Sequence, residues 1–177
     1  MITDDGSVPG IVTQHTDGRM GAVRVHIGGD HAAYELQRAL VTWLGEQGHE
    51  VIDHGPADYD AQDDYPVFVL RAAEAVAADE GSLGIVLGGS GNGEQMAANK
   101  VAGVRAALCY NTELAELARL HNNAQVISIG GRFTAVEEAK EMVTVFLKTE
   151  FTGEERHQRR LDMVAAYEQD KSLPDGA

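Results

Sequence analysis

Residues 84–100 read Gly-Ile-Val-Leu-Gly-Gly-Ser-Gly-Asn-Gly-Glu-Gln-Met-Ala-Ala-Asn-Lys. The apolar run 85–87 predicts a buried strand, and a helix-compatible segment begins at Glu94. Four glycines lie between them, and glycine tolerates positive φ and lets the backbone approach a ligand closely. A strand, a glycine loop and a helix in this order aim backbone N–H groups at an anion. The stretch therefore predicts an anion-binding loop.

Glu94 sets this loop apart from nucleotide-binding loops. The spacing from Gly88 to Gly93 matches a P-loop, but a P-loop continues with lysine where this chain has glutamate. A carboxylate there would repel a polyphosphate, whereas it could take a proton while the N–H groups stabilise charge on an oxygen. The patterns G-x-G-x-x-G and G-x-S-x-G both fail here. For the loop alone, a tight turn without any ligand remains the alternative.

Composition narrows the class of protein. With 177 residues, 44% of them hydrophobic, the chain predicts one domain with a sizeable core. A net charge of −14 argues against binding to nucleic acid or to anionic membranes. The single cysteine, Cys109, allows no intrachain disulfide, which suits the cytoplasm. No segment approaches a transmembrane span. We expect residues 1–21 to form a flexible extension and residues 22–177 to form the domain, which ends in a helix.

Short apolar strands alternate with helical patterns along the domain. Strands are predicted at 23–27, 51–53, 85–87, 104–109 and 126–129. Helices are predicted at 34–47, 65–79, 93–100 and 154–169. Two more helices are predicted from their capping residues: one runs from the N-cap Asn111 to 120, and one follows the capping-box spacing of Thr134 and Glu137. This order predicts an α/β fold: a three-layer α/β/α sandwich with a five-stranded parallel sheet, Rossmann-like.

Ligands of such sheets bind beyond the carboxyl ends of the strands. Four segments that follow predicted strands should therefore share one edge: residues 28–31, 88–94, 110–111 and 130–132. The first holds Asp30 and His31, a carboxylate and an imidazole that can shuttle protons or hold a hydroxylated ligand. A helix cap beside a surface histidine is the alternative for this pair. Placement at the edge favours the functional interpretation.

Cations are few, and three of the fourteen gather near the C-terminus. Arg156 and Arg160 are four residues apart and share one helix face, where they suit bidentate contact with a phosphate. An exposed face balanced by Glu154 and Glu155 is the alternative. Arg132, which follows two glycines at the ligand edge, is a further candidate cation.

Other polar residues give weaker signals. His121 closes the fourth predicted helix, where a favourable contact with the helix dipole is the simpler interpretation. Ser90 has no identifiable base beside it, so we expect it to hydrogen-bond a ligand oxygen. The acidic and histidine residues show no tight metal spacing, so no metal is expected. His26, His49 and His54 are interpreted as structural, and Cys109 as part of the core.

Taken together, these motifs resemble the ribose/galactose isomerase family over nearly all of residues 23–168. The resemblance rests on the segments Gly28-Gly29-Asp30-His31-Ala32, Asp63-Asp64-Tyr65-Pro66, Gly88 to Gln95, Asn99-Lys100, His121-Asn122-Asn123-Ala124, Gly130-Gly131-Arg132 and Arg156-His157-Gln158-Arg159-Arg160. Many members of the family begin the glycine loop with a cysteine base. This chain has Gly88 and Gly89 there, and it resembles the branch that uses the glutamate ending the loop.

The resemblance implies an activity: interconversion of ribose 5-phosphate and ribulose 5-phosphate, a reaction of the pentose phosphate pathway, through an ene-diol(ate) and without metal or organic cofactor. By the same resemblance, Glu94 is the base that moves a proton between C2 and C1. His121 is implied as the acid that opens the ring, with Asp30 as partner or substitute. The implied anion hole, in which Ser90 also contacts the reacting oxygens, is Gly89, Ser90, Gly91, Asn92 and Gly93.

The resemblance also implies how the substrate is held. Asn122 should bind sugar hydroxyls, and the phosphate should be held by His31, Arg132, Arg156 and Arg160. Family members are dimers or tetramers with active sites between subunits, so the arginine helix is expected to serve a neighbour's site. Two alternatives remain open: an isomerase of galactose 6-phosphate or allose 6-phosphate, and a non-catalytic module that binds a phosphorylated ligand.

Overall fold

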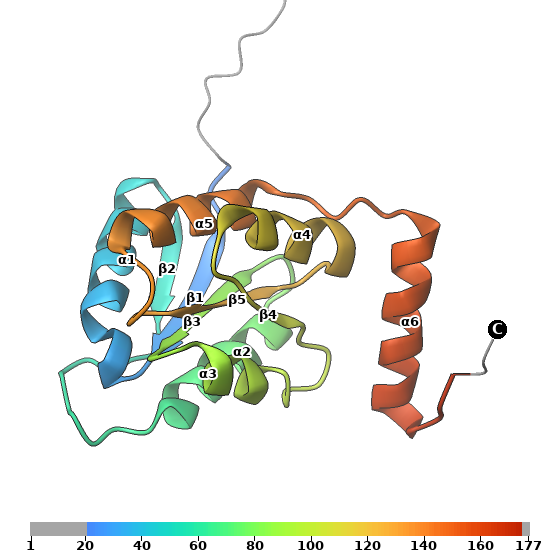
Figure 1. Ribbon diagram of the computed structural model, residues 1–177, viewed down its shortest axis with the longest axis horizontal. Helices are drawn as coiled ribbons and strands as arrows, with labels where there is room; N and C mark the ends of the chain where they lie inside the picture. The colour runs from blue at the N-terminus through green and yellow to red at the C-terminus, as the bar shows by residue number, and fades with distance from the viewer. Residues whose placement is uncertain (1–20, 175–177) are drawn as a thin grey trace, which may run out of the picture.

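A computed structural model describes residues 21–174. One sheet of five parallel strands has the order β2-β1-β3-β5-β4 (Figure 1). The strands are β1 (Arg24–Gly29), β2 (Glu50–Asp53), β3 (Leu83–Gly88), β4 (Ala106–Leu108) and β5 (Val126–Gly130). The predicted five-stranded parallel sheet is confirmed.

Helices cover both faces of this sheet. The helices are η1 (His31–Ala33, a 3₁₀ turn), α1 (Tyr34–Glu46), α2 (Tyr65–Ala78), α3 (Asn92–Ala98), α4 (Thr112–Asn122), α5 (Val136–Lys148) and α6 (Glu155–Asp170). Buried residues of α1, α4 and α5 form one core cluster with the sheet, and those of α2 and α3 form a second. The predicted three-layer sandwich is therefore confirmed, whereas α6 stands apart from the layers (Figure 1).

The central strand β3 shows why its sequence is apolar throughout. Successive side chains of a strand point to opposite faces. Ile85 and Leu87 belong to the core with α1, α4 and α5, and Val86 belongs to the core with α2 and α3. A parallel strand covered on both faces carries an almost continuous apolar run, as residues 85–87 do.

Some predicted boundaries were wrong. Strand β4 is shorter than the predicted 104–109, because Val104 N–H closes a turn on Val101 O instead of joining the sheet. The capping box at Thr134 and Glu137 was wrong by one residue: the backbone N–H of Ala135 donates to Glu138 Oε2 at 3.0 Å. The predicted cap Asn111 is confirmed, since its Oδ1 accepts from Leu114 N–H at 2.8 Å.

The predicted extension, apart from Gly21, lies outside the described residues. Within residues 21–174, no helix is both long enough and apolar enough to cross a membrane.

The register of the strands brings the predicted ligand segments to one edge. Gly28 pairs with Val86, and Gly88 pairs with Gly130, so the chain leaves β1, β3 and β5 at the same end of the sheet. Tyr110, which follows β4, reaches this end as well, because its hydroxyl donates to Ser90 O at 3.3 Å. The grouping expected from the sequence is confirmed.

Candidate active site

A sharp turn places Glu94 beside the end of β3. Gly91 has a φ of 80°, and a side chain there would press on Leu108 Cδ1 at 2.6 Å. The Ser128 hydroxyl, buried in β5, donates to Gly91 O at 2.7 Å and fixes the turn. The chain then enters α3, whose first turn carries Glu94. Only glycine fits this left-handed, crowded position, so the loop sequence directly determines where the glutamate lies.

The Glu94 side chain is buried yet incompletely bonded. The residue is 4% exposed, and its Oε2 has no hydrogen-bond partner within residues 21–174. Burial raises the pKa of this carboxyl, and the charge of Asp30 raises it further, while the backbone N–H groups of Glu94 and Gly91 lower it. An unbonded buried carboxylate with a raised pKa is a typical general base.

The predicted anion hole is partly engaged within the loop itself. Asn92 N–H lies 3.3 Å from Ser90 Oγ, and Asn92 Nδ2 lies 3.2 Å from the same oxygen. Because these amide groups donate, the Ser90 hydroxyl keeps its own proton free to donate to another oxygen.

Asp30 is both a helix cap and a buried carboxylate. It directly follows β1, is 7% exposed, and its Oδ1 accepts from Ala32 N–H at 2.9 Å, which caps the start of the 3₁₀ turn. Burial raises its pKa, against the lowering effects of the Ala32 N–H and of the charges of His31 and Arg132. Two carboxyl groups with raised pKa values, Asp30 and Glu94, thus influence each other at this edge.

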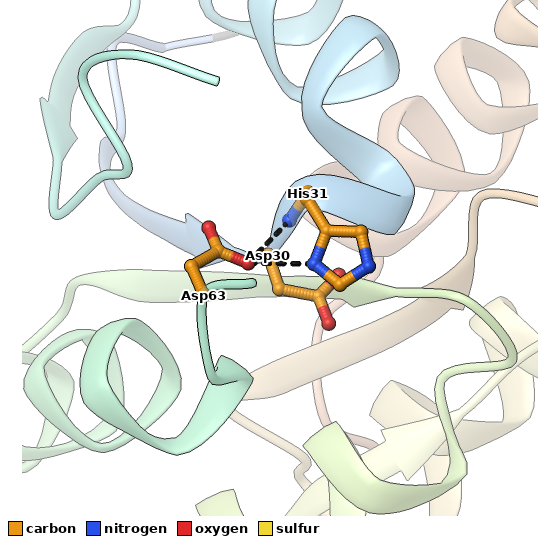
Figure 2. Close-up of side chains that lie close together, drawn as sticks. All are labelled: Asp30, His31 and Asp63. Atoms are coloured by element: carbon orange, nitrogen blue, oxygen red, sulfur yellow. Dashed lines mark hydrogen bonds and ion pairs between the residues drawn. The ribbon is translucent and has the colours of Figure 1, made fainter. Parts of the chain in front are cut away.

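His31 is held by Asp63, to which sequence reasoning gave no role beyond its place in the Asp-Asp-Tyr-Pro motif. Asp63 Oδ1 accepts from His31 Nδ1 at 2.7 Å and from the His31 backbone N–H at 2.9 Å (Figure 2). The hydrogen bond to Asp63 is the main cause that raises the pKa of His31. Asp63 lies 32 residues further along the chain, before α2, so no local spacing could pair it with His31.

Asp30, His31 and Asp63 could hold a metal ion together. One ligand atom from each lies within 4.8 Å of the others. These residues come from two distant segments. The lack of a local metal-binding spacing in the sequence therefore gave no information about them. His31 Nδ1, however, already bonds to Asp63 Oδ1 at 2.7 Å, so we assign this cluster to a hydrogen-bonded Asp–His pair and not to a metal ion.

Two further side chains border the loop. The Arg132 guanidinium lies 3.5 Å from where a Cβ on Gly89 would stand, so this predicted cation reaches the loop. Tyr65, at the start of α2, lies directly against Gly93: a Cβ there would be 2.8 Å from the phenol oxygen. Sequence reasoning gave Tyr65 no role beyond its place in the Asp-Asp-Tyr-Pro motif.

The remaining predicted residues lie elsewhere in this chain. His121 and Asn122 end α4 just before Val126 begins β5, so they lie near the amino ends of the strands. The His121 ring stacks on His157 of α6 with centroids 4.2 Å apart, which places the α6 start, with Arg156 and Arg160, at the same end. Strands of five or six residues separate the two ends by about 15 Å. The chain alone thus does not join these residues to Glu94.

Comparison with known proteins identifies the chain's relatives. The sequence profile described as Ribose/Galactose Isomerase matches residues 25–164. The chain belongs to the ribose/galactose isomerase family. Ribose-5-phosphate isomerase B of Mycobacterium tuberculosis is 54% identical over 155 residues, covering 88% of this chain and 96% of that protein. The protein of the same name from Escherichia coli is 38% identical over 146 residues, covering 82% of this chain and 97% of that protein.

Solved structures of the ribose/galactose isomerase family share the fold. Ribose-5-phosphate isomerase B of Clostridium thermocellum has a TM-score of 0.80 at 40% identity, and the match covers 85% of this chain and 100% of that one. The enzyme of Mycoplasma genitalium, solved with bound ribulose-5-phosphate, has a TM-score of 0.80 at 40% identity, covering 84% of this chain and 97% of that one. The resemblance stated from the motifs is confirmed.

Glycine at position 88 leaves the space that the Glu94 carboxyl group occupies. A Cβ added to Gly88 would overlap the Glu94 carboxyl group, whose Oε1 and Cδ occupy that space. A side chain at 88 and the observed Glu94 conformer therefore exclude each other. A side chain at 88, such as that of cysteine, would therefore displace the Glu94 carboxyl group.

Proposed function

We propose that this protein is an aldose–ketose isomerase that interconverts ribose 5-phosphate and ribulose 5-phosphate. The observation that carries the proposal is the buried Glu94 carboxyl, whose Oε2 is unbonded within residues 21–174 and which lies beside a glycine loop at the ligand edge. Relatives named ribose-5-phosphate isomerase B support the choice of substrate, and one of them was solved with bound ribulose-5-phosphate.

Glu94 acts as the base in this proposal. A hydrogen α to a carbonyl is weakly acidic, so it leaves only if the developing enolate charge is stabilised. The Glu94 carboxylate takes the proton from C2 and returns it to C1, while backbone N–H groups of residues 89–93 and the Ser90 hydroxyl hold the oxygens. Donors of this kind contribute about 3–4 kcal/mol each to the transition state. Asp30, within electrostatic reach of Glu94, assists ring opening or proton transfer between the sugar oxygens.

Two copies of the chain are proposed to complete each site. One copy supplies Asp30, His31, Arg132 and the glycine loop, and the other supplies the end of α4 and the first turns of α6. The separation of these groups in one chain supports this assembly, and so does α6, which stands apart from the sandwich (Figure 1). Its apolar side chains Val164 and Tyr167 are 63% and 44% exposed and are suited to burial against a second copy.

In this assembly Arg156 and Arg160 hold the phosphate for the neighbouring copy. Replacing both by alanine should raise KM about tenfold or more, because charge-assisted contacts to phosphate are lost. Steady-state kinetics give the measurement, and Arg159→Ala removes the same charge from the same helix as a control. An unchanged KM in the double variant would show that both residues only form an exposed helix face and do not bind the phosphate.

Mixing of variants tests the shared site directly. Glu94→Gln chains and Arg156→Ala/Arg160→Ala chains, unfolded together and refolded at equal amounts, should form hybrid dimers with one intact site. At ribose 5-phosphate concentrations at which both parent variants are nearly inactive, random pairing then gives about a quarter of the wild-type activity. A site contained in one copy predicts no recovery, which would contradict the proposed assembly.

The raised pKa of Glu94 predicts the acid side of the pH profile. The base works only when ionised, so kcat/KM should fall with decreasing pH at values above the ordinary glutamate pKa of 4.5. The substrate phosphate also titrates, near pH 6. The pH dependence caused by the substrate phosphate persists in Glu94→Gln, whereas the pH dependence caused by ionisation of Glu94 disappears in this variant. Identical profile shapes for both proteins would oppose the assignment of this base.

One assay with three candidate sugar phosphates tests the identity of the substrate. Ribose 5-phosphate, galactose 6-phosphate and allose 6-phosphate are offered to the pure protein, each with and without a chelator. We expect turnover of the pentose that survives the chelator. Solvent deuterium incorporated at C1 or C2 distinguishes an isomerase from a module that only binds. We also propose a cytoplasmic location, on the basis of the single cysteine and the metabolic substrate.

A further inference from the structure

Asp63 makes an unusual pair of contacts with one neighbour. A single carboxylate oxygen, Oδ1, accepts from both the backbone N–H and the ring Nδ1 of His31, at 2.9 and 2.7 Å. The two bonds fix both the main chain and the ring of His31 at the end of β1. The Asp63 side chain is 8% exposed, and its Oδ2 has no partner in the described part of the chain. A buried carboxylate committed in this way needs an explanation.

The contact determines which nitrogen of His31 faces the site. An ionised carboxylate can only accept, so the ring carries its proton on Nδ1. Nε2 then lies on the side of the ring away from Asp63 (Figure 2). We propose that Asp63 is a positioning residue, which fixes the His31 ring so that Nε2 is presented to the substrate phosphate. This inference rests on the proposed function of the site.

Charge supports the same role. The groups that face His31 are Asp63, Asp30 and the edge of the Tyr59 ring, whose centroid lies 6.5 Å away. Both carboxylates favour the imidazolium, and the pKa of His31 is raised, chiefly by Asp63. Because this shift is upward, the charged form persists to a higher pH, and it is lost as pH rises through the folded-state pKa. A cation with a free N–H is what a phosphate oxygen requires.

The kinetic test is Asp63→Asn, which keeps the shape and removes the charge. KM for ribose 5-phosphate should rise about tenfold near neutral pH, while kcat changes less than about twofold. The rise of KM with pH should also begin at a lower pH than in the wild type. Asp58→Asn removes an exposed charge from the same loop and serves as the control. A loss confined to kcat, or an effect equal to that of Asp58→Asn, overturns the proposal.

A second readout needs neither substrate nor turnover. Nitrogen-15 NMR of the wild-type protein should show the neutral His31 ring protonated on Nδ1, and titration should show a lower pKa in Asp63→Asn. Inorganic phosphate should shift the His31 signals in the wild type, and Asp63→Asn should need about tenfold more phosphate. A wild-type ring protonated on Nε2, or an unchanged pKa in the variant, rejects the role. Absent isomerase activity would reject the proposed function, while these spectra would still decide the role of Asp63.

Discussion

Glu94→Gln should leave only residual turnover while the sugar phosphate still binds. The amide keeps the size of the side chain but cannot accept a proton, and a positioned base contributes about 10²–10⁴-fold to rate. We therefore expect kcat to fall at least a hundredfold and the affinity for ribose 5-phosphate, measured by calorimetry, to change little. Glu74→Gln, which removes an exposed carboxylate from α2, should leave both quantities unchanged.

The same variant should be more stable than the wild type. Since burial raises the pKa of Glu94, ionising this group in the folded state is unfavourable, so stability falls as pH rises through the folded-state pKa. Removing the charge should raise the free energy of unfolding by about 1 kcal/mol at neutral pH. Denaturant titration at neutral pH gives the measurement, and the gain should vanish below the ordinary glutamate pKa. In the kinetic measurement described above, a near-normal kcat of Glu94→Gln would show that another group is the base.

Gly88→Ala should cause the second large loss of activity. The new methyl group occupies the space of the Glu94 carboxyl, which is the far end of a flexible side chain. The glutamate is therefore displaced while the backbone keeps its course. We expect kcat to fall about a hundredfold, with a folded protein by circular dichroism.

A matched control is available in α1. Gly45 has no atom within 4 Å of an added Cβ, so Gly45→Ala should leave kcat unchanged. A combined Gly88→Ala/Glu94→Gln variant should be no less active than Glu94→Gln alone, because the methyl group acts only by displacing the base. Wild-type activity in Gly88→Ala would show that Glu94 works from another position.

The sequence predicted the sheet and the ligand edge but not the pairing of side chains across that edge. Periodicity and the positions of glycine residues report local structure. Residues 84–100 alone were therefore enough to predict β3, the loop and the place of Glu94 at its end. Asp63 and Tyr65 come from the end of the irregular loop before α2 and from the start of α2. Only the tertiary structure shows that Asp63 lies beside His31 and Tyr65 beside Gly93. Boundaries were missed where a turn replaced ladder pairing, as at Val104.

The arginine cluster marks a different kind of limit. Helical spacing places Arg156 and Arg160 on one face, but the sequence does not say what that face meets. In the structure the face lies at the end of the sheet opposite to Glu94, and both side chains are exposed. The role proposed for them depends on a second copy, which local patterns do not encode.

The overlap between Gly88 and Glu94 also links these two positions in evolution. A side chain larger than glycine at 88 excludes this conformer of Glu94, so a change at one position alters what the other can accommodate. We expect these positions to covary among descendants, with a larger side chain at 88 accompanied by something other than this buried carboxylate at 94.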